Sequence, residues 1–102
     1  MEWIDAAAAG DIDEGHSISV AAGSHMIAVI RSEGTLYAIE DMCTHDGEAL
    51  TGGGIVDRQI VCPRHGARFC LRTGEALTPP AYEAVRVFET KIQDGRVWVL
   101  AD

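Results

Sequence analysis

Residues 43–65 read CTHDGEALTGGGIVDRQIVCPRH, and this stretch determines what kind of domain the chain forms. It contains two short motifs, Cys43-Thr44-His45 and Cys62-Pro63-Arg64-His65, each of which brings one thiol and one imidazole together on a tight loop. Sixteen residues separate His45 from Cys62. Thiolate combined with imidazole favours zinc or iron–sulfur chemistry over calcium or magnesium. Two such loops could close on one metal ion or on two linked irons.

The grouping of the four side chains favours the second possibility. A zinc site with two cysteines and two histidines usually takes both cysteines from one loop and both histidines from a helix. In this chain each loop mixes the two types. A [2Fe–2S] cluster with two cysteines on one iron and two histidines on the other needs each loop to reach both irons, which mixed pairs allow. A single structural zinc and a chance placement of the four residues remain as alternatives.

At these residues the chain resembles the Rieske family, and within it the small Rieske-type ferredoxins of bacterial aromatic-ring-hydroxylating dioxygenase systems. The match lies in residues 43–47, 62–69 and 94–99, and it extends over nearly the whole chain in length and element order. The resemblance implies one Rieske [2Fe–2S] cluster per chain, with Cys43, His45, Cys62 and His65 as its ligands. It also implies a set of residues around the cluster: Gly47, Arg64, Gly66, Ala67, Phe69, Pro79 and Pro80.

These surrounding residues have simple expected roles. Gly47 and Gly66 are expected to permit close backbone approach or an unusual φ angle. Residues 78–80, Thr-Pro-Pro, are similar to the proline loop that covers the cluster in the family and limits the access of water. A plain connection between strands is the alternative reading of that segment. Arg64 could contact a partner or remain a solvated surface side chain.

The rest of the sequence predicts an all-β fold. The chain has 102 residues, enough for one domain, and its Ile and Val residues number 17 against 5 Leu. Such β-branched side chains suit a pleated surface. We expect strands at 16–20, 24–31, 35–40, 55–56, 59–62, 67–71, 84–93 and 96–100. The resemblance then implies a Rieske-like antiparallel β-sandwich base, about 1–40 and 82–102, with a small inserted cluster-binding subdomain, about 41–81.

Charge and hydropathy exclude several classes of protein. The net charge is −8, and residues 1–50 carry ten acidic residues against one basic residue. A nucleic-acid partner is not expected, because phosphate neutralisation needs Lys and Arg. No apolar run approaches the length of a membrane span, and the first residues lack the pattern of a signal peptide. We therefore expect a cytoplasmic protein without a membrane partner.

The sequence offers no nucleophile–base pair, so we expect an electron carrier and not an enzyme. The resemblance implies a flavin-dependent ferredoxin reductase as the electron donor and a terminal Rieske non-haem iron oxygenase of aromatic hydrocarbon catabolism as the acceptor. A carrier that docks twice is most simply a monomer. Three alternatives remain: the small subunit of a nitrite-reductase-like enzyme, a component of another oxidoreductase system, and a zinc-stabilised interaction module.

The residues around the cluster predict a low reduction potential, near the end of the Rieske range at about −150 mV. High-potential members of the family have a disulfide where Glu48 and Arg64 stand, and hydroxyl groups that donate to cluster sulfurs where Ala67 and Phe69 stand. Such donors stabilise the reduced form. The double variant Ala67→Ser, Phe69→Tyr is therefore expected to raise the potential in a voltammetric measurement. An unchanged potential would contradict this account of the tuning.

Overall fold

The computed structural model is nearly all-β, as predicted, and it describes residues 1–44 and 47–102. Within these residues no helix has the length and apolar character that crossing a membrane requires. The elements along the chain are β1 (Glu2–Ala8), the 3₁₀ turn η1 (Ala9–Asp11), β2 (Ser17–Ala22), β3 (His25–Ser32), β4 (Thr35–Glu40), β5 (Ile55–Val56), β6 (Gln59–Val61), β7 (Arg68–Cys70), β8 (Val87–Phe88), β9 (Thr90–Gln93) and β10 (Arg96–Ala101).

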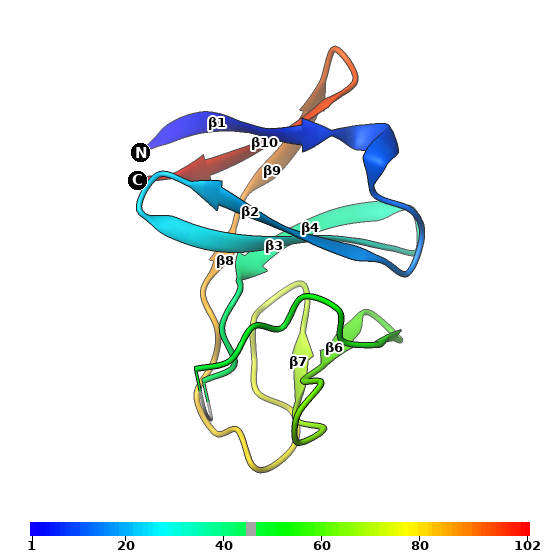
Figure 1. The fold of residues 1–102 in the computed structure, drawn as a ribbon, viewed down its shortest axis with the longest axis vertical. Coiled ribbons are helices and arrows are strands. Elements are labelled where there is room, and N and C mark those ends of the chain that lie inside the picture. The colour runs from blue at the N-terminus through cyan, green and yellow to red at the C-terminus, as the bar shows by residue number, and fades with distance from the viewer. Residues whose placement is uncertain (45–46) are drawn as a thin grey trace.

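The strands form three antiparallel sheets that follow one another along the long axis of the molecule (Figure 1). The first sheet has the order β1-β10-β9, and the second has the order β2-β3-β4-β8. The third and smallest sheet, β5-β6-β7, lies at the opposite end from the first, among the long loops. We call this the loop end of the molecule.

Strand β3 is buried on both faces because two hydrophobic cores lie on either side of the second sheet. Ile27 and Val29 point into the core shared with the first sheet, which we call the base core. Ala28 and Ile30, which alternate with them, point into the core shared with the loop end, which we call the loop core. Side chains of a strand alternate between the two faces of a sheet, so the run that is apolar on both faces serves both cores.

Two strands differ from the sequence prediction. Strand β1 was not expected, because the alanines at 6–9 are weak strand formers. It forms by pairing with β10, where Trp3 lies opposite Leu100 and Ile4 opposite Val99. The single strand expected at 84–93 is divided into β8, in the second sheet, and β9, in the first. It begins only at Val87, because the N–H of Val85 donates to the carbonyl oxygen of Gly74 at 2.9 Å and its buried side chain joins the loop core.

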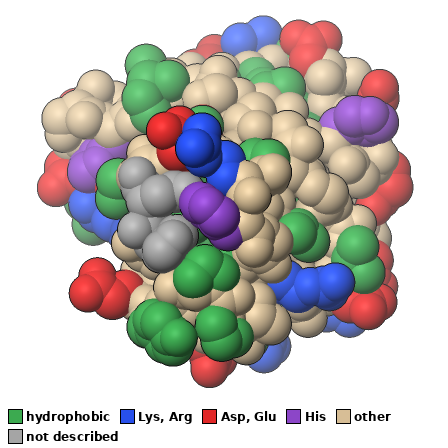
Figure 2. All heavy atoms as spheres, turned by 60° about the horizontal axis from the view of Figure 1, so that its bottom comes forward, with side chains coloured by type: hydrophobic (Ala, Val, Ile, Leu, Met, Phe, Trp, Pro, Cys, Tyr) green, Lys and Arg blue, Asp and Glu red, His purple; other side chains and the backbone are tan. Residues whose placement is uncertain are grey.

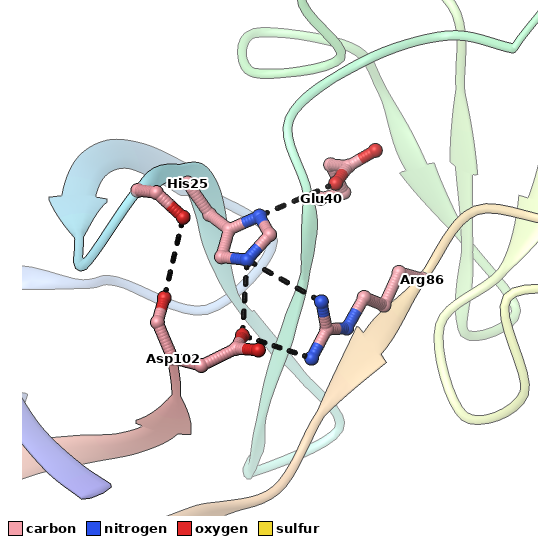
Figure 3. A network of polar contacts seen from close by, with 5 residues as sticks. His25, Glu40, Arg86 and Asp102 are labelled. Atoms are coloured by element: carbon pink, nitrogen blue, oxygen red, sulfur yellow. Dashed lines mark hydrogen bonds and ion pairs between the residues drawn. The ribbon is translucent and has the colours of Figure 1, made fainter. Parts of the chain in front are cut away.

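A polar network joins the base to the segments that lead into and out of the loop end (Figure 3). The His25 imidazole lies 3.2 Å from Asp102 Oδ1 and 3.6 Å from Glu40 Oε2. Arg86 Nη2 also lies 3.2 Å from Asp102 Oδ1, and the N–H of Glu40 donates to the carbonyl oxygen of Arg86 at 2.8 Å. The pKa of Asp102 is lowered, most of all by its hydrogen bond with His25, and the positive charge of Arg86 also contributes. The network therefore ties the chain together where it enters and leaves the loop end.

Two adjacent glycines offer a matched test of how the loop end packs. A methyl group on Gly53 would collide with the carbonyl oxygen of Val61, whereas one on Gly54 would meet nothing within 4 Å. Neither glycine has a positive φ. We expect Gly53→Ala to lower the free energy of unfolding by about 2 kcal/mol, because the backbone must move to make room. Gly54→Ala should be neutral or slightly stabilising. Equal denaturation midpoints for the two variants would contradict this packing.

Candidate metal centre

The loops that begin at Cys43 and Cys62 carry the predicted ligands, and we call them the first and second ligand loops. The first is closed by two backbone hydrogen bonds. The N–H of Gly47 donates to the carbonyl oxygen of Cys43 at 2.7 Å, and the N–H of Cys43 donates to the carbonyl oxygen of Glu48 at 2.7 Å. Gly47 has φ +77°, the left-handed conformation that glycine adopts at little cost. The unusual φ angle expected at this glycine is therefore present.

The second ligand loop repeats this pattern residue for residue. The N–H of Gly66 donates to the carbonyl oxygen of Cys62 at 3.0 Å, and the N–H of Cys62 donates to the carbonyl oxygen of Ala67 at 2.7 Å. Gly66 also has φ +77°. Because the two turns are alike, each presents its cysteine at the same place in the turn. The chain thus has two equivalent turns, each of which could supply one cysteine to the same bound group.

Of the predicted ligands that the structure describes, the two cysteines are buried and the histidine, His65, is exposed. Cys43 is 0% exposed and Cys62 is 1% exposed, and both belong to the loop core. All three cysteines lie in the described part of the chain, and none of them forms a disulfide. His65 is exposed at the surface of the loop end. His45, the remaining predicted ligand, lies outside the described residues.

The described donors, two buried thiols and one exposed imidazole, fit an iron–sulfur cluster. Within residues 1–44 and 47–102, no group of three or more His, Cys, Asp or Glu side chains could hold a metal ion by itself. The predicted ligand set is complete only with His45. Paired, buried thiols on matching turns are the donors that a cluster of this kind requires.

The wall next to the thiols is apolar. Ala67 and Phe69 are both 0% exposed, and Phe69 in β7 pairs with Ile60 in β6. Both side chains belong to the loop core together with Cys43 and Cys62. Neither can donate a hydrogen bond, and their packing keeps water away from the buried thiols.

Residues 78–83, which include the two prolines, are hydrogen-bonded to both ligand loops. The Thr44 hydroxyl donates to the carbonyl oxygen of Glu83 at 2.6 Å, which ties the first loop to the segment that follows the prolines. The N–H of Arg68, two residues after Gly66, donates to the Thr78 hydroxyl at 2.9 Å. The Pro79–Pro80 peptide bond is cis. Residues 78–83 are therefore tied to both ligand loops, and sequence reasoning did not predict the contact made by Thr44.

A charged pair bridges the outer parts of the two loops. Arg64 Nη1 lies 3.9 Å from Glu48 Oε1, and both side chains are more than half exposed. An exposed pair of this kind adds little stability, so we read it as a local restraint between the loops and not as their main support.

Asp41 is the main support of the first loop, and sequence reasoning missed it. Its Oδ1 accepts the N–H groups of Leu50 and Thr51 at 2.8 and 2.9 Å. Its Oδ2 accepts the hydroxyls of Thr51 and of Ser19 in β2 at 2.8 and 2.6 Å. Partial burial alone would raise the pKa of Asp41, but these hydrogen bonds outweigh it and lower the pKa. One carboxylate thus fixes both ends of residues 41–51 to the base.

Cys70, the third cysteine, lies apart from this arrangement. It belongs to β7 and is only partly buried, and it is not a member of the loop core. The pKa of its thiol is lowered, first by a hydrogen bond with the Thr73 side chain, in spite of partial desolvation.

Comparison with known proteins agrees with this geometry. The sequence-family model of the Rieske [2Fe-2S] domain matches residues 2–89. The chain therefore belongs to the family of Rieske [2Fe–2S] domains. The cofactor of this family is a Rieske-type [2Fe–2S] cluster. The predicted family, fold class and cofactor are thereby confirmed.

Individual relatives narrow the class further. The ferredoxin component of the naphthalene 1,2-dioxygenase/salicylate 5-hydroxylase systems of a Ralstonia species is 38% identical over 95% of this chain and 93% of its own length. A solved complex of reduced oxygenase and oxidised ferredoxin in carbazole 1,9a-dioxygenase contains a chain that is 35% identical, with a TM-score of 0.88. That match covers 95% of this chain and 91% of the other. These relatives are components of multicomponent dioxygenase systems.

The hydrogen bonds of Asp41 generate a prediction about the first ligand loop. Asp41→Ala removes four acceptor contacts and is expected to lower the free energy of unfolding by about 2 kcal/mol and to speed the loss of cluster absorbance in air. Asp41→Asn keeps one carbonyl oxygen and should lose less. Asp13→Ala, which removes an exposed carboxylate of the same charge, is the control. If Asp41→Ala loses its colour no faster than the control, Asp41 does not support the loop.

Proposed function

We propose that this chain is a one-electron carrier, the ferredoxin component of an oxygenase system that acts on aromatic compounds. The observation that carries the proposal is the pair of matching turns, which bury two thiols under an apolar wall beside an exposed histidine. The named relatives, which are ferredoxin components of dioxygenase systems, support the same assignment.

The proposed ligands are Cys43 and Cys62 on one iron and His45 and His65 on the other. The cluster supplies a one-electron couple when it is bound. The chain's own residues hold the thiolates in the loop core, exclude water through Ala67 and Phe69, and leave His65 at the surface. With two thiolates and two neutral imidazoles the oxidised site is close to neutral, which makes reduction easier than at a site with four thiolates.

The proposed partners are a flavin-dependent ferredoxin reductase and a terminal Rieske non-haem iron oxygenase. A reduced flavin holds two electrons and this chain takes one, so one reduced flavin serves two copies of the chain in turn. Each reduced copy then loses its electron to the oxygenase and returns to the oxidised form, and no bond forms or breaks. The solved ferredoxin–oxygenase complex of a relative supports the acceptor. The reductase rests on the family resemblance.

We also propose the organisation in which this carrier works. Residues 41–81 serve as the cluster-binding subdomain, and residues 1–40 and 82–102 serve as its base. The chain acts as a monomer, because each docking event needs the same exposed end, and it acts in the cytoplasm. The network around His25 and Arg86 supports this division, because it ties the base together where the chain enters and leaves the loop end.

The nitrite-reductase alternative is less well supported. A solved structure described as a putative NADH-dependent nitrite reductase small subunit from Mycobacterium tuberculosis covers 96% of this chain with a TM-score of 0.86 but is 22% identical. Identity at that level shows the fold alone. The Ralstonia ferredoxin component is more similar in sequence at 38% identity, and this favours the oxygenase system.

The three cysteines provide a matched set of variants for testing the proposal. The wild type and Cys70→Ser are expected to be red-brown, to give a rhombic EPR signal after dithionite reduction, and to support turnover of a terminal oxygenase with its reductase. Cys62→Ser should lose the colour, the signal and the turnover together, because a buried ligand is removed. A colourless wild type with one bound zinc would overturn the carrier function, since zinc has no redox chemistry. Loss of the cluster in Cys70→Ser would overturn the ligand assignment.

A further inference from the structure

We propose that Tyr82 is the contact by which the loop end of this chain recognises its terminal oxygenase and distinguishes it from other acceptors. This inference rests on the carrier function proposed above. It concerns a residue that neither ligates the cluster nor packs in either core.

The backbone on both sides of Tyr82 is fixed. Ala81 is 3% exposed and Val85 is 4% exposed, and both side chains belong to the loop core. Between them, the carbonyl oxygen of Glu83 accepts the hydrogen bond from Thr44 in the first ligand loop. Tyr82 thus stands on a held segment whose next residue, Glu83, is hydrogen-bonded to that loop.

The side chain of Tyr82 is nevertheless 82% exposed. Among the described residues nothing forms a hydrogen bond, ion pair or ring contact with it. A tyrosine ring has only two rotatable side-chain torsions, so immobilising it in a complex costs little conformational entropy. Exposed aromatic anchors of this kind carry much of the binding energy at protein interfaces.

The surface beside the ring is slightly hollowed, and most of the side chains that line the hollow are apolar. A hollow of about 260 Å³ is lined by Ala76, Leu77, Thr78, Pro79, Ala81 and Tyr82. Leu77 is 40% exposed, and Met42, next to Cys43, is 39% exposed. Figure 2, which faces the loop end, shows hydrophobic side chains gathered beside a histidine on this face. A projecting ring beside a hollow fits a partner that offers a socket for the ring and an apolar side chain for the hollow.

The charged residues that flank the hollow indicate which side chains surround the socket on the partner. Glu75 and Glu83 are both exposed, and neither carboxylate forms an ion pair with any residue of the described ranges 1–44 and 47–102. Two unpaired carboxylates at the edge of an apolar patch fit basic side chains around the partner's socket. We assign the contact to the oxygenase because a relative that is 35% identical forms a complex with its oxygenase.

Stopped-flow reduction of an oxygenase tests the assignment. The probes are the terminal oxygenases of carbazole 1,9a-dioxygenase and of the Ralstonia naphthalene system, each mixed in oxidised form with dithionite-reduced carrier freed of excess reductant. For the acceptor that the wild type reduces faster, Tyr82→Ala is expected to lower the second-order rate constant by about 10- to 30-fold. Tyr82→Phe, which keeps the ring, should stay within about twofold. Ile92→Ala is the matched control, since Ile92 is 57% exposed on β9, far from the loop end.

Two further measurements separate docking from damage to the cluster. The EPR spectrum and the midpoint potential of Tyr82→Ala are expected to equal those of the wild type, and so is its rate of reduction by the reductase. If Tyr82→Ala transfers electrons as fast as Ile92→Ala, or slows the reductase step by the same factor, Tyr82 does not select the oxygenase. If the wild type reduces neither oxygenase, the carrier function fails, and this inference fails with it.

Discussion

The central part of β3 is buried on both faces of the second sheet, and the rest of the molecule depends on this constraint. Ile27 and Val29 pack toward the first sheet, while Ala28 and Ile30 pack toward the loops. A strand that serves two cores cannot shift its register by one residue without exchanging the two sets of side chains. The position of β3 therefore determines the surface against which the loop end packs. The irregular loops have only one small sheet, β5-β6-β7, among them.

On that surface the chain forms the same turn twice. These turns give the site a buried side and an exposed side. Each ligand cysteine closes its loop through a carbonyl and an N–H, so its side chain faces the loop core. In the second loop His65 follows three residues later and reaches the surface. The proposed metal centre would thus have an inner side that excludes water and an outer side at His65. The apolar neighbours Ala67 and Phe69 belong to the inner side.

The sequence predicted most of the fold because its strongest signals are local. The Asp94-Gly95 turn has the positive φ angles, +54° and +73°, that a two-residue hairpin requires. Within the strand predicted at 24–31, residues 27–30 are buried on both faces of the sheet. Strand β1 could not be predicted in this way, because its pairing with β10 spans the whole chain. The role of Asp41 was hidden for the same reason, since its partners in β2 and at residues 50–51 are near it only after folding.

The loop end also shows how irregular backbone is made firm without a covalent link between the loops. Asp41 fixes the first loop to Ser19 in β2, Thr44 joins that loop to Glu83 beyond the prolines, and the Thr78 hydroxyl accepts the N–H of Arg68 at the start of β7. Each contact is a single hydrogen bond or a small group of them, and each joins segments that are distant in sequence. An electron carrier benefits from such support, because a site that is already organised needs little rearrangement when its charge changes. None of these hydrogen bonds involves the side chains of Tyr82 or Leu77, so both side chains remain exposed at the surface.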